Sequence, residues 1–337
     1  MIQPFGTLPD GRSVSLYTIA GHGLKAMLTP LGATLVRLYT PDKNGVYDDI
    51  VLGYRDAAAY KADWMNIGAT VGRCANRIRG GTFTLGGQTY TLPQNNMGNN
   101  LHSGPDFYSH RLWEVENYTD ASITFYLESP HMDQGFPGNA KIRITYSLQE
   151  PMTLSIRYEA VSDRDTILNL TNHSCFNLRG HQHPEAAMQQ LLMLPSSKFI
   201  PCDETFVPTG EIRDVAGTPM DFRTPKPIGK DIHADYPPLR NPKGYDHSYP
   251  TEGPLCATLS DPVSGRVMEV YTDSPCVHVY SGNYIDLEGK DNVYYCDRAG
   301  VALETQFYPD AIHHPHWPQP IAKANEVWAG KTDFVFK

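Results

Sequence analysis

Residues 301–316 read VALETQFYPDAIHHPH, an apolar run that turns into a proline-broken loop. Val301, Ala302 and Leu303 begin as a β-strand would, and the carboxylate of Glu304 then interrupts the apolar run. A carboxylate at the end of an apolar strand sits on a rigid element and can still face a cleft. We therefore interpret Glu304 as a candidate general base, with a glutamate paired to an arginine at a sheet edge as the alternative.

Short alternating apolar runs, typical of half-buried strands, fill the chain before this stretch. The two glycines Gly86-Gly87 join two β-rich runs and predict a hairpin with a primed turn. Residues 166–178 and 191–200 are each expected to form one strand, and only residues 55–62 favour a helix. The clearest alternating runs are Ile123-Phe125-Leu127, Ile142-Ile144-Tyr146 and Leu154-Ile156-Tyr158.

A chain of 337 residues is long enough for two domains. The sequence contains no repeat, no low-complexity segment and no shift of composition that marks a linker. We therefore predict a single domain over residues 1–337, with an all-β fold. The expected architecture is a large antiparallel β-sandwich, two sheets packed face to face with one concave face forming a cleft.

The formal net charge of −9 argues against nucleic acid as a partner. The first fifteen residues lack the basic and apolar regions of a signal peptide, and no run approaches the ~20 apolar residues of a membrane span. The six cysteines form no C-x-x-C motif and are expected to be buried thiols. We therefore expect a cytoplasmic protein, a monomer or a homodimer, and take the glycosylation sequons at Asn117, Asn169 and Asn172 as chance matches.

Polar groups that could carry chemistry lie next to turns or strand ends at Arg77, His102, His173, Asp246 and Glu304. Each of these residues, taken alone, is also compatible with a structural role such as a hydrogen-bonded histidine or a capped turn. The sequence has no nucleophile elbow, no Walker loop and no dinucleotide-binding glycine motif. The remaining inventory suits acid–base chemistry on a neutral, polyhydroxylated substrate.

Histidines also cluster at His313, His314 and His316, and three imidazoles raise the question of a metal. Three histidines within four residues of a proline-broken loop point in different directions, so we expect no metal site there.

In combination, five motifs make the sequence similar to the aldose 1-epimerase family, whose members are also called galactose mutarotases. The motifs occur in the family's order and span most of the chain: Gly72–Ile78, Asn100–Gly104, Asn169–Ser174, Gly244–His247, and Leu303–Gln306 followed by Pro309-Asp310-Ala311. The resemblance implies the family's large β-sandwich, catalysis without a cofactor, and an aldose sugar as the small-molecule partner. It also implies the interconversion of α and β anomers of free aldohexoses of the glucose and galactose type.

Carried over to this chain, the resemblance makes Glu304 the general base and His173 the general acid. His102 would assist at the ring oxygen or bind the substrate. Since ordinary carboxyl and imidazole groups titrate near ~4.3 and ~6.5, a base and a partly protonated acid can coexist at neutral pH. We expect the two groups to meet on opposite edges of one pyranose.

The resemblance also assigns Asn76, Arg77 and Asp246 to the sugar hydroxyls. Two positions that line the family's sugar site depart from its common pattern, because this chain has Cys175 in place of a tyrosine and His278 in place of a glutamine. Both departures concern the preferred sugar more than the chemistry.

Two alternative functions stay open from the sequence. One is mutarotation of hexose phosphates, which would need a basic pocket beyond Arg77. The other is a non-catalytic sugar-binding or sensing module.

Overall fold

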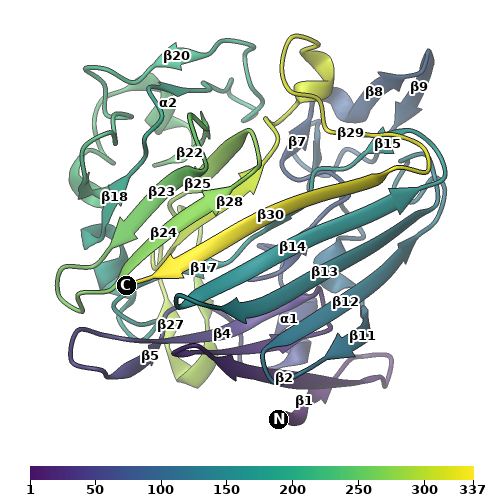
Figure 1. Ribbon diagram of the computed structural model, residues 1–337. Coiled ribbons are helices and arrows are strands. Elements are labelled where there is room, and N and C mark those ends of the chain that lie inside the picture. The colour runs from purple at the N-terminus through teal and green to yellow at the C-terminus, as the bar shows by residue number, and fades with distance from the viewer.

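A computed structural model describes all 337 residues, and most of the regular structure in it is β-strand (Figure 1). Its largest sheet has nine strands, and every pairing within it is antiparallel. In spatial order these strands are β11 (Glu114–Tyr118), β12 (Ser122–Ser129), β13 (Ala140–Gln149), β14 (Thr153–Ser162), β30 (Val327–Phe336), β24 (Val267–Thr272), β23 (Leu255–Ser260), β18 (Leu191–Met193) and β21 (Lys226–Pro227).

The strands of this sheet form where apolar residues alternate with polar ones. Along β13, Ile142, Ile144 and Tyr146 are fully buried while the residues between them are partly exposed. This two-residue period places one face of the strand in the core and the other toward solvent. The alternating runs therefore predicted β12, β13 and β14 correctly.

A second antiparallel sheet of five strands comes from the N-terminal part of the chain. Helix α1 (Ala57–Ala62) follows it, and the Asp56 side chain caps this helix by accepting a hydrogen bond of 2.9 Å from the Ala59 N–H. The predicted helix is therefore confirmed, with a start two residues later. The strands are β1 (Ile2–Thr7), β2 (Ser13–Gly21), β3 (Leu24–Thr29), β4 (Thr34–Pro41) and β5 (Tyr47–Asp49).

A third sheet, of four antiparallel strands, contains the strand that carries Glu304. Its spatial order is β17 (Cys175–Phe176), β28 (Val301–Gln306), β25 (Cys276–Tyr280) and β22 (Asp246–Pro250). The prediction of an all-β fold with large antiparallel sheets is confirmed, and this third sheet adds to the two that were expected.

Paired short strands complete the fold. The expectation of one strand over residues 166–178 was wrong, because that segment bridges three different partners in turn. Residues 191–200 likewise divide into two short strands. The two-stranded pairs are β6 (Thr70–Val71) with β16 (Thr171–Asn172), β7 (Arg77–Ile78) with β10 (Asn100–Leu101), β8 (Thr82–Leu85) with β9 (Gln88–Thr91), β15 (Thr166–Ile167) with β29 (Ile321–Ala322), β19 (Lys198–Phe199) with β20 (Arg213–Asp214), and β26 (Leu287–Glu288) with β27 (Tyr294–Tyr295).

The glycine pair between β8 and β9 adopts the predicted turn. Gly86 and Gly87 have φ angles of 59° and 80°, the left-handed region that a primed hairpin turn requires at both central positions. The only other α-helix is α2 (Pro237–Arg240), and neither helix is long enough to cross a membrane.

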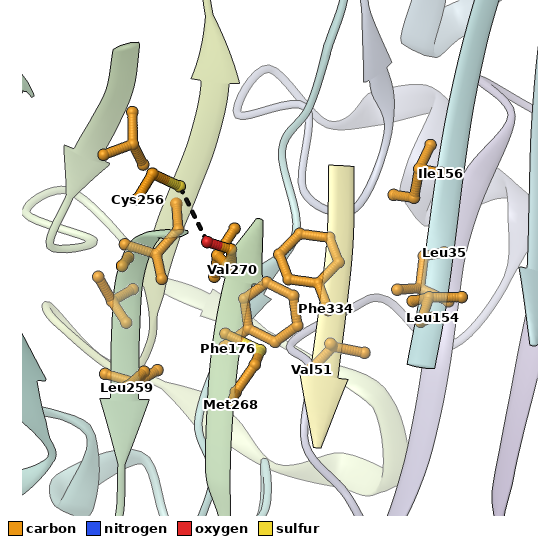
Figure 2. Packing of buried hydrophobic residues seen from close by; sticks show 14 of the residues in the cluster. Leu35, Val51, Leu154, Ile156, Phe176, Cys256, Leu259, Met268, Val270 and Phe334 are labelled. Carbon is orange, nitrogen blue, oxygen red and sulfur yellow. Dashed lines mark hydrogen bonds between the residues drawn. The ribbon is translucent and has the colours of Figure 1, made fainter. Parts of the chain in front are cut away.

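The core is an apolar cluster of 49 buried residues that extends in sequence from Ile19 to Phe336. It draws on the nine-stranded, five-stranded and four-stranded sheets together. Figure 2 shows Phe176 of β17 packed on Phe334 of β30, with ring centroids 5.0 Å apart. One apolar cluster shared by all three sheets supports the prediction of a single domain, which stays a prediction.

Candidate active site

A cleft of about 580 Å³ adjoins the four-stranded sheet. It is lined by side chains from β28, β25, β22, β7 and β10 and from several loops. The predicted site residues that line it are Asn76, Arg77, His102, His173, Asp246, His278 and Glu304. Groups that are far apart in the sequence therefore meet at one hollow.

Three neighbouring strands place their cleft-lining residues by register. His278 on β25 is the direct cross-strand partner of Glu304 on β28, and Ser248 on β22 is its partner on the other side. In the next row, Tyr280 lies opposite Asp246. Because residues two apart in a strand share a face, both rows project from the same side of the sheet.

Glu304 and His173 form the closest pair of candidate acid and base. Glu304 Oε1 lies 3.5 Å from His173 Nε2, and the side chains are only 2% and 8% exposed. Glu304 Oε2 and His173 Nδ1 are buried and have no hydrogen-bond partner in the protein. Buried polar atoms are normally paired, so these two unpaired atoms are exceptions that call for an explanation.

That these groups meet on opposite edges of one pyranose stays a prediction; in the structure the two side chains lie side by side. The hydroxyl oxygen O1 and the ring oxygen O5 of a pyranose are both bonded to C1. A base at one oxygen and an acid at the other must therefore be close neighbours.

His102 is held by Asn76 through two hydrogen bonds. The Asn76 N–H donates to His102 Nδ1 at 3.0 Å, and the His102 N–H donates to the Asn76 carbonyl oxygen at 2.9 Å. Burial, with the nearby His173 and Arg77, lowers the pKa of His102 well below its ordinary value. A neutral ring that accepts at Nδ1 carries its proton on Nε2, which makes His102 a hydrogen-bond donor.

Arg77 is a buried guanidinium without a carboxylate partner. Its Nε donates to Asn96 Oδ1 at 3.1 Å, and its Cζ lies 5.0 Å from the centre of the Phe206 ring. The two terminal nitrogens make no hydrogen bond to the protein, although the residue is only 8% exposed. This leaves a planar pair of donors free for substrate oxygens.

Asp246 and His278 form a tight pair on adjacent strands. His278 Nε2 donates to Asp246 Oδ1 at 2.6 Å, and His278 Nδ1 lies 2.9 Å from Ser248 Oγ. Burial opposes both charges, but the mutual hydrogen bond raises the pKa of His278 and holds the pKa of Asp246 well below its usual range. Asp246 Oδ2 makes no hydrogen bond to the protein.

The structure does not place Cys175 in the lining of the cleft, which corrects the expectation from the sequence. Cys175 is fully buried and packs in an apolar cluster that includes Tyr280 and Ala302. Burial raises the pKa of its thiol. Cys175, on β17 of the four-stranded sheet, therefore packs within the protein and is not exposed to the cleft.

Several lining residues were missed in the sequence. Tyr280 could have been found, because it lies two residues after His278 on the same strand face. Phe206, Tyr284 and Asn96 come from other segments whose local sequence carries no signal of a site. Their recruitment depends on contacts between distant parts of the chain.

The histidine-rich segment after β28 forms no metal centre. His313 Nδ1 lies 2.7 Å from Asp310 Oδ1 and His314 Nε2 lies 3.8 Å from Asp310 Oδ2. No group of three or more histidine, cysteine or acidic side chains is arranged to hold a metal ion.

Comparison with known proteins places this arrangement in one family. The family model described as aldose 1-epimerase matches residues 15–335. A galactose mutarotase from Sus scrofa is 37% identical over 339 residues, which cover 98% of this chain and 97% of the relative. An aldose 1-epimerase from Escherichia coli (strain K12) is 34% identical over 337 residues, with 97% and 96% covered.

Solved structures agree with the sequence relatives. An aldose epimerase homologue from C. elegans superposes with a TM-score of 0.90 at 32% identity, over 96% of this chain and 99% of that chain. A galactose 1-epimerase from Lactobacillus acidophilus NCFM gives a TM-score of 0.87 at 25% identity, over 100% and 98%. The chain belongs to the aldose 1-epimerase family.

Proposed function

We propose that the protein is an isomerase that interconverts the α and β anomers of free aldohexoses of the glucose and galactose type. The observation that carries this proposal is the pairing of Glu304 and His173 at 3.5 Å inside the cleft, each with an unpaired polar atom. The sequence relatives named galactose mutarotase and aldose 1-epimerase, aligned over nearly the whole chain, support the same activity.

In the proposed reaction, Glu304 removes the proton from the C1 hydroxyl while protonated His173 donates a proton to the ring oxygen. The C1–O5 bond breaks, and an open-chain aldehyde forms. After rotation about C1–C2, the steps reverse and return both protons. Each proton-transfer group contributes roughly 10²–10⁴-fold to the rate.

Three neighbouring groups hold the sugar while C1 turns. The free terminal nitrogens of Arg77 donate to sugar hydroxyls, and Asp246 Oδ2 accepts from them. Asn76 Nδ2 lies 3.5 Å from His278 Nε2 and adds an amide donor next to this pair. His278 acts through Asp246, because its own nitrogens are already engaged.

The lining favours neutral sugars over sugar phosphates. It contains one arginine and no lysine, while Asp246 and Glu304 contribute two carboxylates. A phosphate group would meet repulsion from both carboxylates with a single guanidinium to bind it. A cytoplasmic location and a monomeric or homodimeric state stay predictions from the sequence.

Polarimetry of freshly dissolved α-D-glucose and α-D-galactose tests the proposal. The wild-type protein is expected to accelerate the approach to equilibrium in a saturable manner. Glu304→Gln is expected to lose nearly all turnover and keep its fold, whereas the exposed-site control Glu326→Gln keeps full turnover. Saturable sugar binding by the wild type without accelerated mutarotation would instead support a sensing module.

A further inference from the structure

Asn169 joins two backbone segments that the site depends on. Its N–H donates to the Arg73 carbonyl oxygen at 2.8 Å, and its carbonyl oxygen accepts from the Ala75 N–H at 2.8 Å. These two bonds form the parallel bridge between Asn169 and Cys74, in a fold whose other pairings are antiparallel. The segment held in this way continues directly into Asn76 and Arg77.

The Asn169 side chain adds a third segment. Its Oδ1 accepts from the Phe307 N–H at 2.8 Å, and its Nδ2 donates to the Ala75 carbonyl oxygen at 3.4 Å. The residue is 1% exposed, so water cannot replace either bond. A carboxamide is the side-chain group that supplies a donor and an acceptor together at this length without a charge.

The three joined segments are those that carry the acid, the base and the sugar-binding groups. Phe307 follows Glu304 by three residues, and His173 follows Asn169 by four. The link is reinforced nearby, because the Asp310 N–H donates to the Arg77 carbonyl oxygen at 2.9 Å. Loss of the Asn169 side chain would break the direct hydrogen-bonded link between the segment after Glu304 and the segment before Arg77.

We propose that Asn169 is a positioning residue that fixes the placement of Glu304 against His173 and against the segment bearing Asn76 and Arg77. The inference rests on the proposed anomer interconversion, in which both protons move at a single sugar carbon. The same contacts explain the asparagine of the Asn169 sequon by a structural role. Its side-chain nitrogen is buried in the folded protein and is not available for glycosylation.

The test compares Asn169→Ala with a matched control, Asn177→Ala. Asn177 is also fully buried and also bridges segments, donating to the carbonyl oxygens of His183 and Ala299 at 2.8 and 3.1 Å. Both variants are expected to lower the melting temperature. At a temperature where both are folded, Asn169→Ala is expected to lose about 10²-fold in kcat, because misplacement of reacting groups by ~1 Å costs that much.

Comparing the effects on kcat and on KM distinguishes a positioning role from general destabilisation. For Asn169→Ala we expect KM to change less than about threefold, because the sugar-binding side chains are still present. Asn177→Ala is expected to keep the wild-type kcat per folded molecule. Equal losses of kcat in the two variants, or a wild-type kcat in Asn169→Ala, would overturn the proposal.

Asn169→Asp provides a second variant if the alanine variant does not fold. An aspartate still accepts from the Phe307 N–H, but it can donate to the Ala75 carbonyl oxygen only when protonated. The ratio of its kcat to that of the wild type is therefore expected to rise as the pH falls from about 8 to about 5. If the ratio of the two kcat values does not change with pH, the proposal for Asn169 is contradicted. The wild type is measured in the same assay, so a failure of the proposed function, in which the wild type itself would be inactive, can be distinguished from this outcome.

Discussion

His278 lies directly opposite Glu304 in the β25–β28 ladder, and its Nε2 is 2.6 Å from Asp246 Oδ1 on the next strand. One imidazole thus stands between the proposed base and a proposed sugar-binding carboxylate. Because all three side chains project from the same face, the charge on His278 acts on both carboxylates at short range.

His278→Gln is expected to move the acid limb of kcat/KM to higher pH. His278 holds the pKa of Asp246 well below its usual range, and burial pushes that pKa upward once the cation is gone. Asp246 then becomes protonated, and loses its acceptor role, at a higher pH than in the wild type. Profiles of kcat/KM between about pH 4 and pH 9 measure this shift.

Ser248→Ala is the control for that experiment, since it removes the partner of His278 Nδ1 and leaves the bond to Asp246 in place. We expect only a small movement of the acid limb in this variant. An acid limb that stays in place in His278→Gln would show that His278 does not govern Asp246.

His173→Asn is expected to reduce kcat by roughly 10²–10⁴-fold, because the asparagine cannot donate a proton to the ring oxygen. The KM should change little, since Arg77 and Asp246 still hold the sugar. His131→Asn, at an exposed loop position, should behave as the wild type. Initial rates measured by polarimetry, with enough enzyme to detect residual turnover, give kcat and KM. A kcat near the wild-type value would refute the role of His173 as the acid.

Arg77→Lys is expected to raise KM about tenfold or more, since a charge-assisted hydrogen bond contributes about 1.5–3 kcal/mol. A lysine keeps the positive charge but cannot present two parallel donors, nor hold the bond to Asn96 Oδ1 in the same geometry. Arg79→Lys is a suitable comparison, because Arg79 pairs with Asp203 and does not line the cleft. Initial rates measured over a range of sugar concentrations give the KM of each variant. An unchanged KM in Arg77→Lys would show that Arg77 does not bind the sugar.

Lys290 is expected to make the stability of the protein depend on pH above neutrality. Burial lowers its pKa to about 8, although its Nζ lies 2.7 Å from Asp49. The unfolded chain, with an ordinary lysine pKa of ~10.4, binds this proton more tightly. The contribution of Lys290 to the free energy of unfolding should therefore rise as the pH increases from about 8 to about 10.

Lys290→Met should abolish that rise, whereas the exposed-site control Lys141→Met should retain it. Urea denaturation at several pH values between about 7 and 10 gives the free energy of unfolding as a function of pH for each protein. If the free energy of unfolding rises equally with pH in the wild type and in Lys290→Met, the buried amine keeps an ordinary affinity for its proton.

The sequence predicted the regular parts of the fold because local patterns determine them. Alternation along β12, β13 and β14, the glycine pair at residues 86–87 and the apolar run of β28 each specify an element without outside help. Residues 166–178 were misjudged as one strand, since their three short pairings depend on partners elsewhere in the chain.

The candidate site was also predicted where a local motif marks a residue, and missed where contacts between distant segments bring a residue to the cleft. The motifs around Arg77, His173 and Glu304 indicated which side chains to examine, whereas Phe206 and Asn96 carried no local signal. Cys175 was misplaced because the family resemblance that assigned it to the sugar site does not determine whether apolar neighbours cover it in this chain. Burial of that kind is a property of the folded molecule as a whole.

The place of β30 in the nine-stranded sheet has a consequence for biosynthesis. This strand lies between β14 and β24, yet it follows both in the chain (Figure 1). While a ribosome is still adding residues before Val327, those two neighbours present open backbone edges of the kind that attract other chains. Until that final strand is added, the nine-stranded sheet therefore stays divided into two parts.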